Sequence, residues 1–213
     1  MDETVSVRSY KMRTDCGFAP NPYGGMLTIA TCKAYIREVA ACGEWIAGFT
    51  SQALNGDPAG EERLVFLMRV TGKLRRDVYY DLFPQKRPDQ DPCGDNIYRP
   101  DGNGGYCHVG GIHYTSAEDQ EKDRKSEWVL LSDDFYYFGG KPVRVDAVSL
   151  KVPRSQSRYG TLTKGIPAEA FIGFITQYAA KHYPGKSGMF EEPYAPPHKA
   201  RCPSSCGSAN IQC

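Results

Sequence analysis

Apolar residues recur along this chain with two spacings, which predict short strands and short helices. Positions 5–13 alternate apolar and polar side chains, a period of two that is typical of a half-buried strand. The ranges 44–51, 63–73, 128–132 and 142–148 are rich in β-branched and aromatic residues, and they are predicted to be strands as well. A turn-forming sequence at positions 55–58 separates the first two of these.

Three segments carry the helical spacing instead. Thr31 is a predicted N-cap for a helix that ends at Gly43, and positions 75–83 place apolar residues on one face before Pro84. Pro167 suits the first turn of a third helix, which runs out before Pro184. The apolar stripe of this last helix consists of Phe171, Phe174, Ile175 and Tyr178.

Other segments show no regular period. Positions 15–25 hold two prolines and three glycines and are predicted to be a loop. The glycine-rich range 84–127 is interpreted as a structureless lid or binding loop, because so long an excursion in a compact domain usually serves a function. The C-terminal stretch is rich in Pro, Ser and Cys. We therefore expect one domain over residues 1–188 and a poorly ordered tail over 189–213.

The order of these elements determines the expected fold class. Short strands outnumber helices, and the regular strand–helix–strand alternation of a doubly wound sheet is missing. The sequence therefore predicts an α+β fold with a small mixed β-barrel or curled sheet, flanked by two to three helices.

Composition limits the classes of function. The 213 residues have a formal net charge of +1, which excludes a globally basic nucleic-acid coat. Apolar runs are far shorter than the roughly 20 residues of a membrane span, and no secretory signal is visible, so a cytoplasmic protein without a membrane partner is expected. In that compartment the eight cysteines are expected to be thiols rather than disulfides.

Basic residues gather in one stretch, positions 141–164, which contains a single acid. They are Lys141, Arg144, Lys151, Arg154, Arg158 and Lys164. A phosphate backbone is predicted to contact the first five, and a solvated charged face is the alternative.

Several sequence blocks carry a family resemblance. The blocks are DCGFAPNP at 15–22, TCK at 31–33, GEWIAG at 43–48, DNIY at 95–98 and SDDFYYFG at 132–139. In content and order they resemble the nucleotide modification associated domain family, type two, over roughly residues 10–145. The resemblance implies an association with DNA base-modification or defence systems of bacteria and phages. Nucleic acid or a nucleotide with a modified base is the partner it implies.

The GEWI block is also similar to an element of PUA-like domains, with Glu44 in place of the usual aspartate. That superfamily includes modified-base readers of the EVE, YTH and SRA types. The similarity implies a PUA-like fold and a pocket that grips a flipped base.

A base reader needs flat apolar walls and a few directional polar groups. The candidate walls are Phe18, Trp45, Tyr98, Phe135 and Tyr136, and the candidate polar groups are Asp15, Asn21, Asp95, Asn96, Ser132 and Asp134. The alternatives are ordinary ones: a tryptophan that begins a strand is often a core residue, and Asp or Asn in a Pro/Gly-rich loop often satisfies a turn.

Two further classes of function stay open. An enzyme acting on a modified nucleotide, by glycosidic or phosphoryl chemistry, would use Asp15, Asp95 or Asp134, although the chain contains no Walker loop, nucleophile elbow or zinc-protease motif. A protein-interaction accessory subunit is the third class. No cofactor or metal is expected. The alternative is a zinc site on Cys202, Cys206 and Cys213, whose spacing is looser than that of zinc knuckles.

Overall fold

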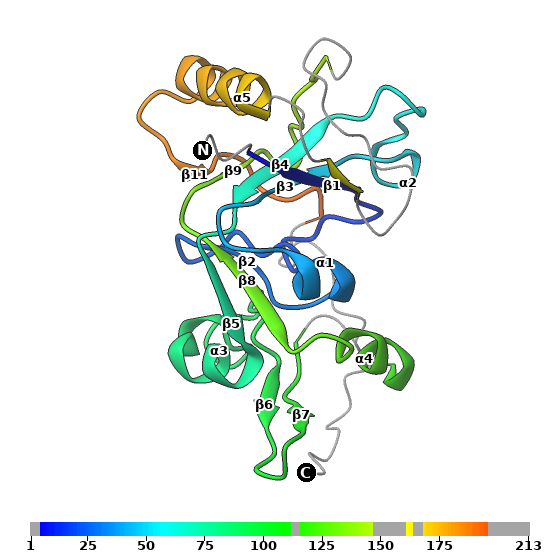
Figure 1. Ribbon diagram of the computed structural model, residues 1–213, viewed down its shortest axis with the longest axis vertical. Helices are drawn as coiled ribbons and strands as arrows, with labels where there is room; N and C mark the ends of the chain where they lie inside the picture. Colours follow the sequence, from blue (N-terminus) through cyan, green and yellow to red (C-terminus); the bar gives the residue numbers. More distant parts are fainter. Residues whose placement is uncertain (1–4, 112–115, 147–160, 164–167, 196–213) are drawn as a thin grey trace.

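The computed structural model describes residues 5–111, 116–146, 161–163 and 168–195. These residues form an elongated α+β body in which one large sheet lies under helix α5, and a smaller sheet, the helices α1, α3 and α4 and a protruding hairpin lie on the other side (Figure 1). The strands belong to three sheets, and none of the three is a closed barrel within the described residues. The predicted α+β class is confirmed.

The large sheet has six strands of mixed direction. In spatial order they are β10 (Thr161–Thr163), β1 (Val7–Lys11), β3 (Trp45–Phe49), β4 (Leu64–Arg69), β9 (Phe135–Tyr137) and β11 (Gly188–Met189). Strand β1 runs parallel to β3, β9 runs parallel to β11, and the remaining pairs are antiparallel.

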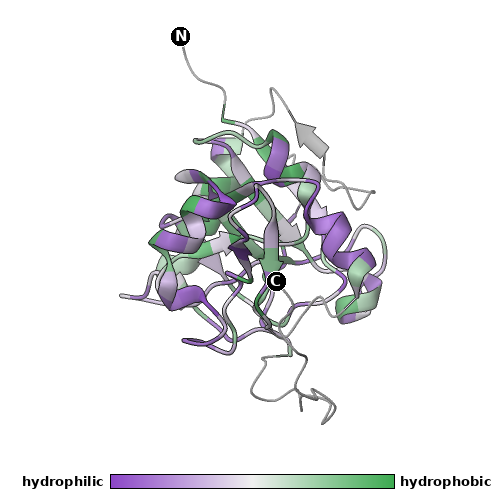
Figure 2. Ribbon diagram, turned by 90° about the horizontal axis from the view of Figure 1, so that it is seen from below, coloured by the Kyte–Doolittle hydropathy of each residue, from purple (hydrophilic) through white to green (hydrophobic). Residues whose placement is uncertain are grey.

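Each face of this sheet covers a separate apolar core because strand side chains alternate between faces. On one face Trp45 and Phe49 pack beneath Phe171 and Ile175 of α5 (Ala168–His182). On the other face Ile46 packs with side chains of β2 and α1. Coloured by hydropathy, the inner strands are green and the outer helices carry purple faces (Figure 2).

The smaller sheet has the order β2 (Leu27–Ile29), β8 (Trp128–Ser132), β5 (Gly72–Arg75) and is fully antiparallel. Helix α3 (Arg76–Leu82) follows β5 directly, and the 3-10 turn Pro84–Lys86 follows α3. Strands β6 (Tyr98–Pro100) and β7 (Tyr106–His108) form the hairpin that projects from this end of the molecule (Figure 1).

Three short helices complete the described chain: α1 (Ala34–Val39), α2 (Gln52–Asn55) and α4 (Ala117–Asp123). The side chains of Ser51 and Ser116 cap α2 and α4 by accepting hydrogen bonds from backbone amides. None of the described helices has the length and apolar character that crossing a membrane requires.

Most of the predicted elements are confirmed, with shifted ends. Strands β1, β3, β4 and β8 and helices α1, α3 and α5 lie where the apolar pattern puts them. Thr31 is not the N-cap of α1, however. Lys33 takes that place with left-handed backbone angles, and the Thr31 side chain is buried.

The range 84–127 is not structureless, contrary to the prediction. It contains the 3-10 turn, both hairpin strands and α4. The apolar period is absent because these elements are only three to seven residues long, and the hairpin turn is held by the Asp101 carboxylate, which accepts hydrogen bonds from the backbone amides of Asn103 and Gly105.

The strand predicted at 142–148 is also wrong over its described part. Val143 makes an isolated bridge with Leu64, and the strand that pairs with β4 on this side is β9, which lies between the strands predicted at 128–132 and 142–148. Positions 147 and 148 lie outside the described residues.

The first residues after position 188 belong to the folded body. Met189 pairs with Tyr137, and Phe190 is 7% exposed in the core beneath α5. The backbone amide of Ala195 donates a hydrogen bond to the carbonyl of Asp15. Residues 196–213 lie outside the described part of the chain.

Candidate functional site

The residues that the sequence suggests for a base pocket lie in several separate clusters. Trp45 is buried on the α5 face of the large sheet. Tyr136 lies on the same face, where its hydroxyl shares a hydrogen bond with Thr176 of α5 at 2.9 Å. Phe135 lies on the opposite face, so the sheet itself separates it from Trp45. These three aromatic residues contribute to the two cores rather than to one pocket.

Asp15 lies on that second face, beside the C-terminal segment. Its carboxylate accepts hydrogen bonds from the Tyr137 hydroxyl and from the Tyr194 backbone amide. Burial raises the pKa of Asp15 above its ordinary value, and these hydrogen bonds oppose that rise. Asp15 therefore joins two distant parts of the chain.

Phe18 and Tyr98 do come together. Both are buried, and they form a small apolar cluster with Ile97. The guanidinium of Arg76 lies 4.2 Å from the centroid of the Tyr98 ring. The Tyr98 ring therefore already has a stacking partner within the protein.

Asn21 and Asp95 belong to one buried polar network, whose centre is Lys86. The Lys86 ammonium is 3% exposed and donates to Asn21 Oδ1 at 2.9 Å, the Met26 carbonyl at 2.7 Å and Thr28 Oγ1 at 3.1 Å. Thr28 in turn donates to Asp95 at 2.7 Å. Burial lowers the pKa of Lys86 to about 8. Sequence reasoning missed Lys86, which carries no motif.

Asp95 and Asn96 also hold helix α3. The Tyr79 hydroxyl donates to the Asp95 carboxylate at 2.7 Å, and burial raises the pKa of Asp95. The Asn96 side-chain amide donates to the carbonyls of Tyr79, Tyr80 and Phe83 at the C-terminal end of the helix. The described partners of this pair are thus all internal.

Ser132 and Asp134 form the turn between β8 and β9. The Ser132 hydroxyl donates to the Asp134 carbonyl at 2.8 Å and accepts from the Asp134 amide at 3.2 Å. The Asp134 carboxylate is 44% exposed and lies 4.0 Å from Arg69. Of the three candidate catalytic carboxylates, Asp15 and Asp95 are buried in hydrogen-bonded networks, and Asp134 stands apart from both.

The predicted phosphate contacts are described only in part. Lys141 pairs with Glu191 at 2.9 Å, and Arg144 lies 3.9 Å from Glu61. Lys151, Arg154 and Arg158 lie outside the described residues, as do the possible zinc ligands Cys202, Cys206 and Cys213. Within the described ranges no group of three or more His, Cys, Asp or Glu side chains is placed to hold a metal ion.

A cavity of about 690 Å³ lies between α1 and α4, and it contains none of the suggested pocket residues. It is lined by Cys32, Lys33, Ala34, Tyr35, Ile36, Glu38, Asp119, Lys122, Asp123 and Lys125. Its size falls within the roughly 300–1,000 Å³ that is usual for small-molecule sites. One sequence signal pointed to it, because Cys32 and Lys33 belong to the TCK block.

Backbone geometry sets Cys32 and Lys33 apart. Their φ angles are 54° and 46°, and they are the two non-glycine residues with positive φ in the described part of the chain. This conformation costs a residue with a side chain about 1–2 kcal/mol. The amide of Arg37 donates to the Lys33 carbonyl, so α1 begins at this strained turn. Both residues of the turn line the cavity.

The wall between α1 and α4 is a buried ion-pair cluster. Arg37 is fully buried, and its guanidinium donates to the Asp123 carboxylate and carbonyl, each at 2.7 Å, and to the Ser126 and Trp128 carbonyls. Arg76 lies 3.6 Å from the same carboxylate. Asp123 is thereby matched by two guanidinium groups, and the cavity wall is rigidly connected to α3.

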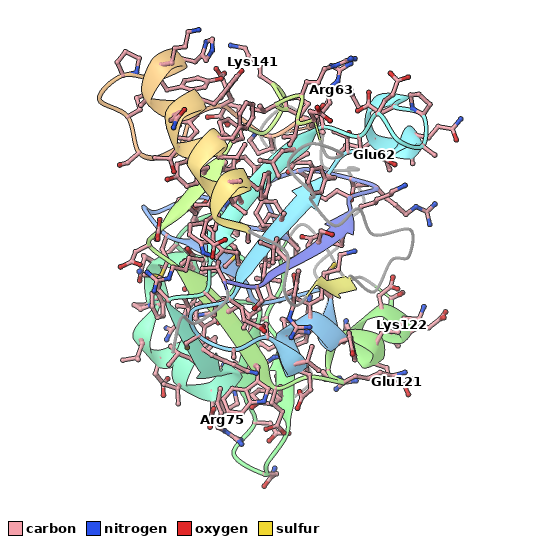
Figure 3. All side chains as sticks on the ribbon, turned by 45° about the horizontal axis from the view of Figure 1, so that its top comes forward. Glu62, Arg63, Arg75, Glu121, Lys122 and Lys141 are labelled. Atoms are coloured by element: carbon pink, nitrogen blue, oxygen red, sulfur yellow. The ribbon has the colours of Figure 1, made fainter. Side chains whose placement is uncertain are left out.

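Three amines line the cavity, and they differ in their partners. Lys122 pairs with Glu118 at 2.7 Å along α4 and projects outward from that helix (Figure 3). Neither Lys33 nor Lys125 takes part in an ion pair within the described residues. Tyr35 is 56% exposed and offers an aromatic face at the rim. The cavity thus combines cationic groups with an exposed ring.

Comparison with known proteins gives one match. The family model described as nucleotide modification associated domain 2 matches residues 4–192. No curated protein and no solved structure matches the chain. The match includes β1 through β11, the strained Cys32–Lys33 turn and both walls of the cavity. The chain therefore belongs to the nucleotide modification associated domain 2 family.

Proposed function

We propose that this protein recognises a modified base, in a nucleotide or in nucleic acid, and that the ligand enters the cavity between α1 and α4. The main observation in support of this proposal is the cavity itself, which is lined by Lys33, Lys122 and Lys125 together with the exposed ring of Tyr35. A nucleotide combines a phosphate with a flat base, and these are the two chemical groups that amines and an aromatic face bind.

The electrostatics of the cavity support an anionic ligand. Asp123 is matched by Arg37 and Arg76, and Asp119 lies 3.7 Å from Lys122. Among the described residues, one carboxylate that lines the cavity, Glu38, has no ion pair. Two amines that line it, those of Lys33 and Lys125, have none either. The balance in the cavity therefore favours a phosphate.

The proposed ligand, a modified base, and the proposed biological context rest on family membership and on the sequence blocks. Membership supports a role in nucleotide or DNA modification, and the GEWI block supports a relation to PUA-like readers, which take up a flipped base. A bacterial or phage modification or defence system is the proposed context, and its protein components are proposed partners. Nucleic acid outside the cavity would meet Lys141 and Arg144 as phosphate contacts.

The deciding experiment measures binding of a panel of modified and unmodified nucleotides and matched oligonucleotides, with mass spectrometry of each mixture after incubation. We expect selective retention of one modified base without a change in ligand mass. Tyr35→Ala should weaken binding about five- to 150-fold, because base–aromatic stacking contributes about 1–3 kcal/mol. The double change Lys122→Gln with Lys125→Gln should weaken binding of phosphorylated ligands more than of nucleosides.

The matched control is Lys181→Gln, which removes an exposed amine from the last turn of α5, away from the cavity. Binding should be unchanged in this variant. A loss of binding in Lys141→Gln, with the cavity variants unaffected, would move the site to the opposite end of the molecule (Figure 3). A change in the mass of the ligand would make the protein an enzyme.

A further inference from the structure

Lys33 differs from the other lysines that the structure describes in detail. Lys11 and Lys141 pair with carboxylates, and Lys86 donates to four oxygen atoms. The Lys33 amine instead lies 4.4 Å from the centroid of the Tyr10 ring, and no carboxylate pairs with it within the described residues. It is half-buried and lines the cavity. An amine so placed is held by an aromatic face and not by a counter-ion.

The surroundings of Lys33 are those of a reactive amine. Burial lowers the pKa of Lys33, and the nearby Cys32 thiol opposes this shift weakly. A larger share of the amine is therefore neutral at a given pH than for an exposed lysine, and the neutral form is the nucleophile. The hydroxyl of Tyr10, whose ring the Lys33 amine contacts, is buried and has no hydrogen-bond partner among the described residues.

The strained turn gives the same indication. Lys33 adopts its left-handed conformation although glycine would adopt it at no steric cost. Backbone strain of this kind gathers at functional sites, where the surrounding structure enforces it. Here the buried Arg37 donates through Nε to the Cys32 carbonyl at 2.8 Å, which fixes the turn from below.

We infer that Lys33 is the nucleophilic amine of the cavity and captures an aldehyde-bearing ligand, a formyl-substituted base, as a reversible imine. The inference rests on the proposed function, because that function makes the ligand a base. Among modified bases, this inference favours those that carry an electrophilic formyl carbon as ligands.

The chemistry balances without a co-reactant. The nitrogen lone pair of neutral Lys33 attacks the formyl carbon, and the resulting carbinolamine loses its oxygen as one molecule of water to give the C=N bond. The two nitrogen protons leave with the departing water, and hydrolysis reverses the step. No oxidation occurs, so binding is covalent and recoverable.

The test is reductive trapping. The protein is incubated with 5-formyl-2′-deoxycytidine or 5-formyl-2′-deoxyuridine 5′-monophosphate and sodium cyanoborohydride, and the adduct is located by intact mass and peptide mapping. We expect a single adduct on Lys33, with a mass gain of one nucleotide less one oxygen atom. The 5-hydroxymethyl analogues should give none. Lys33→Arg, which keeps the positive charge, should lower the adduct yield more than tenfold.

Controls separate specific capture from general lysine labelling. Lys181→Arg should give the wild-type yield, and unfolding midpoints of both variants should match the wild type. The inference is overturned if labelling is spread over exposed lysines at rates equal to that of Lys33, or if Lys33→Arg retains the adduct.

The outcome also distinguishes this inference from the proposed function. Selective binding of the hydroxymethyl nucleotides by the wild type, with no adduct from the formyl nucleotides, would overturn the imine and leave the function standing. Preferential labelling of Lys33 by butyraldehyde, with no nucleotide bound, would overturn both the proposed function and the capture of a formyl-substituted base.

Discussion

At the scale of single residues, Glu44 shows how a motif position acts through structure. The sequence relates Glu44 to the aspartate of PUA-like domains. In the fold its carboxylate accepts hydrogen bonds from Arg8 Nε at 2.8 Å and from the Ala41 amide at 3.1 Å. Burial tends to raise the pKa of Glu44, but the hydrogen bond from Arg8 and the other donors outweigh it, and the net pKa is lowered.

This lowered pKa gives a prediction with a definite sign. A carboxylate whose pKa is lower in the folded state stabilises the fold above its unfolded pKa, and the stabilisation is lost as the pH falls through the folded pKa. Glu44→Gln should therefore lower the free energy of unfolding by about 1–2 kcal/mol at pH 7. The difference should vanish at a pH below the folded pKa. Urea unfolding over that pH range measures it, and a pH-independent difference would contradict the account.

The sequence alone does not predict the structural roles of several candidate residues. The sequence suggests Asp15, Asn21, Asp95 and Asn96 as polar groups that contact a base, whereas the structure gives each of them hydrogen-bond partners within the protein. Their main partners Tyr137, Lys86 and Tyr79 lie far along the chain, and no local pattern reports such pairings. The same holds for Tyr35 and Lys125, whose roles depend on the cavity that α1 and α4 form together.

At the scale of elements, helix α1 is too short to be stable alone and depends on the packing around it. Arg37 attaches it to α4 through the buried Asp123 carboxylate, with both side chains almost fully buried. Removal of Arg37 leaves the buried Asp123 carboxylate with Arg76 alone, at 3.6 Å, and loss of a partner from a buried ion pair is strongly destabilising.

Arg37→Met should accordingly lower the free energy of unfolding by about 3–5 kcal/mol. Hydrogen exchange at the amides of α1 and α4 should speed up before exchange in the large sheet does. The control is Arg75→Met, because Arg75 pairs with Glu127 while 51% of its side chain is exposed, and the loss of stability should be far smaller than for Arg37→Met. Equal losses in the two variants would refute the cluster as the connection between the helices.

Elements with their own apolar pattern were predictable, and elements defined by partners were not. Helix α5 and strand β4 repeat apolar residues over their length, so their periods are visible in the sequence. Strands β2 and β9 have three residues each, too few to show a period, and they exist because neighbouring strands hydrogen-bond to them.

At the scale of the whole molecule, the C-terminal segment adds the edge strand β11 to the large sheet. Gly139 permits the close approach of this segment, because its φ is +47° and a Cβ there would lie 2.2 Å from the carbonyl oxygen of Glu192. A Cβ on its neighbour Gly140 would lie 3.5 Å from the same carbonyl oxygen, which is an ordinary van der Waals contact.

Gly139→Ala should therefore destabilise the protein by several kcal/mol, because the backbone of residues 191–192 must move in addition to the strain of positive φ. Gly140→Ala is the matched control and should be tolerated. Thermal unfolding followed by circular dichroism compares them, and limited proteolysis should cut the Gly139→Ala variant first within residues 189–195. Similar midpoints for the two variants would show that the segment is not held at Gly139.

The contact between Ala195 and Asp15 has a consequence for the order of folding during synthesis. The first strand of the large sheet leaves the ribosome early, but β11 and residues 194–195, which hydrogen-bond to Asp15, are made after all the other described strands. Until they emerge, one side of β9 is an open strand edge, which is a template for pairing with other chains. The nascent protein thus carries an aggregation-prone edge from the synthesis of Tyr137 until Gly188 and Met189 emerge and pair with β9.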